Sequence, residues 1–429
     1  MKRKLIAAVG VVAMVAGVAA CGSDGGGNAN KDPKERTGDL KVWLMVDAQT
    51  AWPELVEDVN AEFRKKYPKV KVKVDFQQWP NKVQKLDAAL TGKGAPDVVE
   101  LGNTETMQYI LGGALAEIDA EQYENSDTWI KGLKDTCTSD GKLYCVPYYA
   151  GARVGIYNED MFKGAGVQAA PETEDALTAA LDRIEKKYGS EKAFSSLYMP
   201  GRYWYAAMSY VKAYGGSIAT EDGGKWRASL SSPESIKGIE HWAELVEKYY
   251  GGDKTKDEAD QSAVMSQKKS AVMYGNGWEA GVVFDKKAGD PKLEGKIKNF
   301  AFPGPGGKTL PSFIGGSDLA ITQRSENQDL AAAWIKEFTS EKSQSVLVGK
   351  NTLPNNTKQL EPLKNKPETA ASANAVEGAW FTPIAPGWAS IEKKQILQKM
   401  LVDIVTGKKS VKEAAKAADT EIDSIINTG

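Results

Sequence analysis

Between residues 40 and 101, the spacing of hydrophobic positions switches repeatedly between the periods of strands and helices. Alternating or short apolar runs indicate strands, and apolar residues that recur every three or four positions indicate helices. The predicted segments are, in chain order, strand 40–46, a helix from Pro53, strand 70–76, helix 81–91 and strand 97–101. Strands separated by single helices predict a parallel α/β sheet with right-handed crossovers.

The rest of the chain is mainly helical, with one return to strand. Thr173 and Ser232 precede segments whose apolar residues lie on one helical face, and both are favoured N-cap residues. After Phe300, a glycine- and proline-rich stretch leads into a predicted strand at 313–321 and then into another helix. The last helix opens at Ser410 with a glutamate three residues later, which is the capping-box pattern.

The first twenty residues have the pattern of an export signal. Three basic residues precede an apolar run from Leu5 to Val18, which is too short to span a bilayer. The ending Val18-Ala-Ala-Cys21 resembles the lipobox of bacterial lipoproteins, which implies cleavage before Cys21 and a lipid on its sulfur. The alternative is an ordinary secreted protein with a cysteine here by chance. Residues 21–37 are polar and glycine-rich, and predict a flexible tether.

Length and charge narrow the class of protein. A chain of 429 residues predicts two domains. Its formal net charge of −2 becomes −5 without the three basic residues of the signal, and both signs are mixed along the chain. No concentrated basic face points to nucleic acid. No second apolar run is long enough for a membrane span, so the membrane is expected to be reached by the lipid anchor alone.

Two further cysteines remain. Cys137 and Cys145 flank a turn that contains aspartate and glycine. Outside the cell such a pair predicts a disulfide rather than a metal site, with two free thiols as the alternative.

Candidate catalytic motifs are scarce. The single histidine, His241, lies on a helical face beside Trp242, and neither G-x-S-x-G, H-E-x-x-H nor a phosphate-binding Gly-Lys loop occurs. No cofactor or metal is therefore expected, and the chain is predicted not to be an enzyme. The main rival is a secreted glycoside hydrolase, since 57 acidic residues leave the required carboxylate pair neither supported nor excluded. A binding protein for a peptide or a metal is a second rival, although histidines and a clamp for peptide termini are lacking.

Several segments, taken by order and spacing, resemble the extracellular sugar-binding proteins of ATP-driven importers, the family that includes the maltose-binding protein. The segments are Gly94-Ala-Pro-Asp-Val-Val99, Leu143-Tyr-Cys-Val-Pro-Tyr148, Tyr157-Asn158, Met273-Tyr-Gly-Asn-Gly-Trp278, Gly315-Gly-Ser317 and Leu353-Pro-Asn355. Within that family, the segments 101–107, 148–153 and 201–208 are most similar to the chitobiose-binding lipoproteins of streptomycetes.

The resemblance implies a two-lobed periplasmic-binding-protein fold, in which each lobe is a sheet flanked by helices and the ligand lies between the lobes. Lobe one would comprise 38–148 and 302–346, and lobe two 149–301 and 347–429. The hinge is expected near 148–152 and 299–303. The resemblance further implies a monomer on the extracellular face of the cell membrane that captures a saccharide, with N,N′-diacetylchitobiose expected and cellobiose or maltose as alternatives. It would then deliver the sugar to the importer's membrane subunits.

Aromatic side chains in loops are candidates for stacking on sugar rings, because saccharides offer apolar ring faces. Trp278 follows a Gly-Asn-Gly turn and Trp388 follows a Pro-Gly pair, so both rings are expected in the cleft. Weaker candidates are Tyr149, Tyr203, Trp204, Tyr205 and Trp380. Tryptophans on apolar helix faces or inside a strand are predicted to be core, namely Trp43, Trp242 and Trp334, while Trp52 and Trp129 stay undecided.

Polar candidates lie where predicted strands or turns end. Asp47 and Asn103 follow two strands, and Glu279 follows the tryptophan turn, so we expect them to hydrogen-bond sugar hydroxyls. The alternative is that Asp47 and Asn103 only cap the next helix. Arg202 is expected to grip a hydroxyl or to pair with a carboxylate, and Ser317 to contribute beside two glycines that permit close approach.

Overall fold

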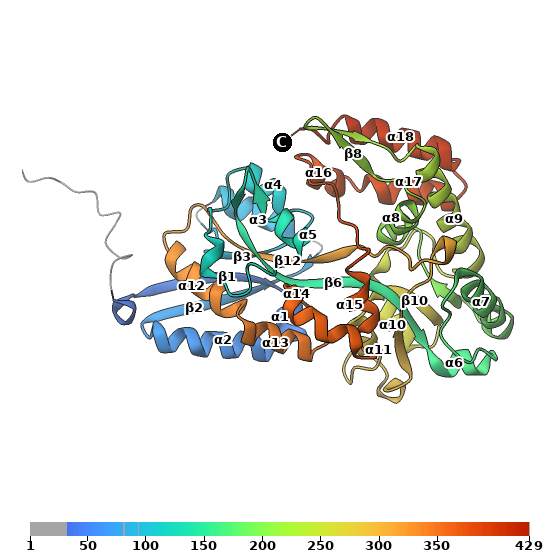
Figure 1. Cartoon of the computed structure of the whole chain (residues 1–429), viewed down its shortest axis with the longest axis horizontal. Helices are drawn as coiled ribbons and strands as arrows, with labels where there is room; N and C mark the ends of the chain where they lie inside the picture. The colour runs from blue at the N-terminus through green and yellow to red at the C-terminus, as the bar shows by residue number, and fades with distance from the viewer. Residues whose placement is uncertain (1–31, 80–81, 93, 429) are drawn as a thin grey trace, which may run out of the picture.

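The computed structural model describes residues 32–79, 82–92 and 94–428 and consists of two lobes, each built on its own hydrophobic core (Figure 1). The predicted signal peptide, Cys21 and most of the predicted tether lie outside these residues. None of the helices among the described residues is long and apolar enough to cross a membrane.

The sheet of the first lobe has the predicted parallel start. Strands β1 (Gly38–Met45), β2 (Val70–Gln77) and β3 (Val98–Gly102) run parallel, with Leu40 opposite Val72 and Val42 opposite Val98. Helices α2 (Pro53–Lys66) and α3 (Lys82–Thr91) connect them, which confirms the predicted order of strands and helices. β12 (Ile314–Ile321) then joins β3 in antiparallel pairing.

One long strand links the two lobes. β6 (Cys145–Asn158) is buried along its whole length. Its first half pairs with β12 and β13 (Leu353–Pro354), and its second half with β10 (Ser270–Asn276) and β11 (Ile297–Phe300). β7 (Ser195–Tyr198) extends the second sheet beside β10. Figure 1 shows β6 crossing from one lobe to the other. Short hairpins complete the strands, with bounds β4 (Thr138–Ser139), β5 (Lys142–Leu143), β8 (Ala219–Asp222) and β9 (Lys225–Ala228).

Helices cover both sheets. The remaining ones are α1 (Val46–Thr50), α4 (Thr106–Leu111), α5 (Lys131–Thr136), α6 (Glu159–Gly164), α7 (Glu174–Tyr188), α8 (Trp204–Ala213), α9 (Pro233–Tyr249), α10 (Gln261–Ser266), α11 (Glu279–Val283), α12 (Gln328–Phe338), α13 (Glu341–Gly349), α14 (Thr357–Leu360), α15 (Ala370–Ala375), α16 (Trp388–Lys393), α17 (Ile396–Val405) and α18 (Val411–Asp423). Thr173 and Ser232 cap α7 and α9, and Ser410 with Glu413 forms the predicted capping box of α18.

The cores locate the boundary between the lobes. Trp334 lies in the first core and Trp242 in the second, while Trp43 packs against the first, as predicted. The two undecided tryptophans, Trp52 and Trp129, also belong to the first core. Phe302, Leu310, Phe313 and Ile314 pack in the second core, and we propose that the boundary between the lobes lies within β12 rather than at 302. The chain returns to the first lobe within β12, beside the start of β6.

The cysteine prediction is confirmed. Cys137 and Cys145 form a disulfide with an S–S distance of 2.05 Å, and it lies in the first core. The bond ties the end of α5 to the start of β6.

Candidate functional site

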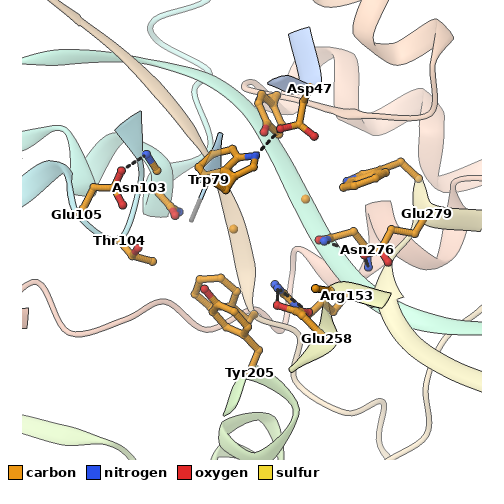
Figure 2. A pocket seen from close by; sticks show the side chains of 18 of the residues that line it. Asp47, Trp79, Asn103, Thr104, Glu105, Arg153, Tyr205, Glu258, Asn276 and Glu279 are labelled. Atoms are coloured by element: carbon orange, nitrogen blue, oxygen red, sulfur yellow. Dashed lines mark hydrogen bonds and ion pairs between the residues drawn. The ribbon is translucent and has the colours of Figure 1, made fainter. Parts of the chain in front are cut away.

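A cleft of about 590 Å³ lies between the lobes. The first lobe contributes residues that follow β1, β2 and β3, namely Asp47, Trp79, Lys82, Asn103, Thr104 and Glu105. The floor is formed where β6 and β12 cross between the lobes, and the second lobe supplies the facing wall (Figure 2). The carboxyl ends of parallel strands meet at one sheet edge, which explains why three separate loops converge here.

The wall of the first lobe is a network around Trp79. Its indole N–H donates to the Asp47 carboxylate at 2.5 Å. The Lys82 ammonium lies 4.0 Å from the centre of the Trp79 ring and 2.5 Å from a Glu105 carboxylate oxygen. A Cβ on Gly102 would come within 2.8 Å of the Lys82 nitrogen, so a larger residue at position 102 would displace the ammonium. The network fixes the position of the Trp79 ring at the cleft.

Burial raises the pKa of the Asp47 carboxyl, and the hydrogen bond from Trp79 offsets part of that shift. Asn103 is held differently: its side-chain amide donates to the Ile314 carbonyl at 3.2 Å, and its backbone N–H donates to the Gly316 carbonyl. Neither Asp47 nor Asn103 is an N-cap residue of a helix, so the capping alternative does not apply. Both side chains border the cleft.

The floor of the cleft depends on glycine. A Cβ on Gly151 would meet the Asn276 side-chain oxygen at 2.9 Å, and one on Gly316 would meet the Tyr149 carbonyl oxygen at 2.2 Å. The absence of side chains here lets a bound molecule approach the backbone of β6 and β12 closely. Tyr149 and Gly315 border the same floor.

A buried arginine organises the wall of the second lobe. Arg153 is only 7% exposed, and its guanidinium lies 3.9 Å from the centre of the Tyr205 ring. It donates to Glu258 at 2.9 Å and to the Tyr203 hydroxyl at 3.0 Å. Tyr205 also stacks on Phe313, with the ring centres 4.5 Å apart. The aromatic ring of Tyr205 is thereby fixed on both sides.

Glu279 lies beside Trp278 at the start of α11. Its carboxylate accepts hydrogen bonds from the backbone N–H of Asn276 at 2.8 Å and from the side chain of Gln261. Burial, and then the negative charge of Glu258, raise the pKa of Glu279 to about 7. Trp278, Asn276 and Glu279 all face the cleft, and Figure 2 shows Asn276 and Glu279 on the side opposite Asn103 and Glu105.

The structure brings half of the predicted site residues to the cleft. These are Asp47, Asn103, Tyr149, Tyr205, Trp278 and Glu279. Their contacts with a ligand stay predictions. The other six do not border it, namely Arg202, Tyr203, Trp204, Ser317, Trp380 and Trp388.

Three of these six are tryptophans that pack behind the cleft wall. Trp388 is 2% exposed because α16 begins at this residue and turns the ring into the second core, 6.0 Å from the Trp204 ring. Trp204 in turn lies 4.0 Å from the ring of Tyr205. Trp380 donates its indole N–H to Ser209 and packs against Phe313. These three tryptophans therefore do not border the cleft. Trp204 and Trp380 pack against the Tyr205–Phe313 pair, and Trp388 packs behind Trp204.

The other three hold polar positions away from the cleft. The Tyr203 hydroxyl bridges Arg153 and the Tyr274 carbonyl. Ser317 is fully buried within β12. Arg202 donates to the side chain of Gln395 at 2.5 Å, with Asp257 at 3.9 Å.

Sequence reasoning missed several residues that border the cleft, above all Trp79, Lys82, Arg153, Glu258 and Asn276. Trp79 follows the carboxyl end of β2, the same signal that identified Asp47 after β1. Arg153 is the one charged residue in strand β6. A single charge in an otherwise uncharged strand could have identified it as a candidate site residue. Glu258 opens a short 3-10 helix, Glu258–Asp260, and nothing in its local sequence indicates a binding site.

Comparison with known proteins gives a consistent set of matches. Residues 43–345 match the family described as bacterial extracellular solute-binding protein. The chain is 32% identical to the diacetylchitobiose binding protein DasA of Streptomyces coelicolor, with 98% of each chain covered. It is 24% identical to the maltodextrin-binding protein MdxE of Bacillus subtilis, covering 94% of this chain and 92% of that protein.

Solved structures share the fold. The GacH receptor of Streptomyces glaucescens matches with a TM-score of 0.79 at 21% identity, covering 92% of this chain and 100% of that one. A solute-binding protein of an ABC transporter from Thermotoga lettingae matches with a TM-score of 0.78 at 23% identity, covering 91% and 100%. Both are two-lobed proteins of the predicted α/β class, so the predicted fold is confirmed.

Proposed function

The chain belongs to the bacterial extracellular solute-binding protein family, and we propose that it is the sugar-capturing subunit of an ABC importer, with N,N′-diacetylchitobiose or a related chito-oligosaccharide as its ligand. The observation that carries this proposal is the facing arrangement of fixed aromatic rings and hydrogen-bond acceptors across the cleft. The 32% identity to a diacetylchitobiose binding protein over nearly the whole of both chains supports the choice of sugar.

The chemistry of the cleft suits a saccharide. Trp79 from one lobe and Trp278 from the other offer flat faces for the apolar sides of sugar rings, and the edge of Tyr205 borders the same space. Asp47 and Glu279 offer carboxylate oxygens that can accept from hydroxyl or acetamido N–H groups. Such a mixture of aromatic surface and a few fixed polar groups is typical of small-molecule sites.

Capture would proceed by closure of the lobes. The two chain crossings that line the floor, in β6 and β12, would form the hinge. Lys393 of α16 lies 3.8 Å from Asp87 of α3, so the two lobes already contact each other beside the cleft. A ligand favours the closed form only by contacts that the open form lacks, and rings from both lobes supply such contacts.

The proposed setting is the outer face of the cell membrane. A lipid on Cys21 would anchor the monomer, and the importer's membrane subunits would receive the sugar from the closed form. The protein would act without chemistry on the sugar, as expected from relatives that are described as binding proteins. Two of the five carboxylates that border the cleft are already paired with cations, Glu105 with Lys82 and Glu258 with Arg153.

Calorimetric titration tests the proposal. The chain from residue 22 onwards would be titrated with N,N′-diacetylchitobiose, cellobiose and maltose. We expect one-to-one binding of N,N′-diacetylchitobiose near the micromolar range, about −8 kcal/mol, and weaker binding of the other two. Tighter binding of cellobiose or maltose would replace the ligand, and release of monosaccharide during incubation would favour a glycoside hydrolase. Failure of the folded protein to bind all three would contradict the proposal.

A further inference from the structure

A second cavity of about 210 Å³ continues from the cleft, and we refer to it as the outer cavity. It lies between α3 of the first lobe and the segment from α16 to the start of α17 of the second. Its residues on these two sides are Val83 and Gln84, and Ala389, Glu392, Lys393 and Gln395. Glu105 and Glu392 border both the outer cavity and the cleft, so the two spaces meet between these carboxylates.

We propose that the outer cavity is a further saccharide subsite, which holds the third unit of a chito-oligosaccharide whose first two units occupy the cleft. The inference rests on the proposed function and extends it, because it assigns a preferred ligand length. The cavity communicates with solvent, since Gln84, Lys393 and Gln395 are exposed. A chain longer than three units can therefore continue out of the protein.

The lining of the outer cavity has the polarity that a sugar unit requires. Val83 and Ala389 provide a small apolar surface from each side, while Gln84 and Gln395 provide amides that both donate and accept. Glu392 provides an acceptor at the passage from the cleft. Burial, and then the negative charge of Glu105, raise the pKa of Glu392 to about 7.

The backbone turn and the side-chain contact of Gln395 hold this residue at the outer cavity. This residue has φ 54° and ψ 43°, the left-handed region that non-glycine residues rarely occupy. This conformation commonly ends a helix, and here it separates α16 from α17 beside the outer cavity. Arg202 donates to the side-chain oxygen of Gln395 at 2.5 Å, so the amide N–H groups of Gln395 are left to donate to a sugar. Arg202 would thus be a positioning residue of the outer cavity rather than a direct contact in the cleft.

The outer cavity is assembled from both lobes. α3 and α16 approach one another at the Lys393–Asp87 pair, beside the residues that line the cavity. A third sugar unit would therefore make contacts that exist only when the lobes are closed, and would strengthen binding by favouring closure.

The test compares ligands that differ only in length. Calorimetry with the dimer, trimer and tetramer of β-1,4-linked N-acetylglucosamine is expected to give about tenfold tighter binding of the trimer than of the dimer, and no further gain with the tetramer. The variant Ala389→Trp fills the outer cavity and is expected to remove the gain while leaving the affinity for the dimer within about twofold. Ala61→Trp, at an exposed alanine of α2, is the matched control and should retain the gain.

A second, less disruptive variant distinguishes loss of the subsite from a folding defect in Ala389→Trp. Arg202→Ala releases Gln395 without adding bulk, and we expect it to weaken the trimer about fivefold and the dimer hardly at all. Equal affinities of dimer and trimer in the unmodified protein would overturn the subsite and leave the proposed function intact. Equal losses for dimer and trimer in both variants would also overturn it. Failure to bind any chain length would overturn the proposed function and the subsite together.

Discussion

The indole N–H of Trp79 donates to the carboxylate of Asp47 across a gap of 2.5 Å, although 31 residues separate the two along the chain. Asp47 lies in the first turn of α1, directly after β1, and Trp79 lies just beyond β2, the strand that pairs with β1 in parallel. The hydrogen bond therefore joins the loops of two neighbouring strands into one wall of the cleft. An acidic side chain here both orients the ring and remains beside it as an acceptor.

This relationship predicts that Trp79 contributes to binding through its position as well as its surface. We expect Trp79→Ala to weaken binding of N,N′-diacetylchitobiose at least thirtyfold, about 2 kcal/mol, because a central aromatic anchor is lost. Trp79→Phe should cause a smaller loss, since it keeps a ring but not the N–H that bonds to Asp47. Calorimetric titration measures both.

Trp226→Ala is the control for this prediction, because Trp226 lies in the hairpin of β8 and β9, which does not border the cleft. The control should bind as the unmodified protein does. Unchanged affinity of Trp79→Ala would remove Trp79 from the binding site.

Truncation of Trp388 is expected to lower stability, and truncation of Trp278 is expected to lower affinity for the sugar. Trp388→Ala should lower the free energy of unfolding by about 3–5 kcal/mol, because it leaves a cavity in the second core. Trp278→Ala should weaken sugar binding and leave stability nearly unchanged, because its ring borders the cleft. Urea denaturation followed by circular dichroism, paired with titration, separates the two effects. A stable Trp388→Ala that loses only affinity would contradict the packing described here.

The difference between these two tryptophans shows what the sequence could and could not predict. Hydrophobic periodicity predicted β1, β2, β3 and the helices between them, because each buries one face against a shared core. The same order of strands placed Asp47 and Asn103 at one sheet edge. A Pro-Gly pair before Trp388 indicates a loop, but loop composition says nothing about the direction of the next side chain.

Contacts between distant segments could not be predicted from the sequence for a related reason. The stack of Arg153 on Tyr205 and its pairing with Glu258 join β6, α8 and a short helix, whose closeness depends on the whole second lobe. Likewise, the apolar residues from Phe302 to Ile314 fit either core by their pattern alone. Only their packing in three dimensions assigns them to the second lobe.

The disulfide is expected to stabilise the first lobe without shaping the cleft. The double variant Cys137→Ala, Cys145→Ala should lower the free energy of unfolding by about 2–3 kcal/mol, because a short loop in the unfolded chain is no longer closed. Neither cysteine borders the cleft, so sugar affinity should change less than twofold. Urea denaturation of the oxidised protein and of the double variant gives the difference. Equal midpoints would show that the bond contributes nothing to stability.

The carboxyl group of Glu279 predicts a specific dependence of stability on pH. Burial, and then the charge of Glu258, raise its pKa from 4.5 to about 7 in the folded protein. Below pH 4.5 the group is protonated in both the folded and the unfolded chain, and it has no effect on their balance. Between pH 4.5 and 7 the unfolded chain releases this proton and the folded chain retains it, so the free energy of unfolding falls as the pH rises. Above pH 7 both states are ionised and the effect is constant.

Glu279→Gln removes this titration and keeps a side chain that can accept from Gln261 or Asn276. The unfolding free energy of the unmodified protein, relative to that of the variant, is therefore expected to fall by up to about 3 kcal/mol between pH 4.5 and 7. Urea denaturation at half-unit pH steps measures the difference, and Glu234→Gln, at an exposed residue that opens α9, should follow the unmodified protein. Parallel curves for Glu279→Gln and the unmodified protein would mean that Glu279 ionises in the folded state as readily as in water. The carboxylate would then face the cleft well solvated, and its hydrogen bonds to a sugar would be correspondingly weak, because water would compete for the same oxygens.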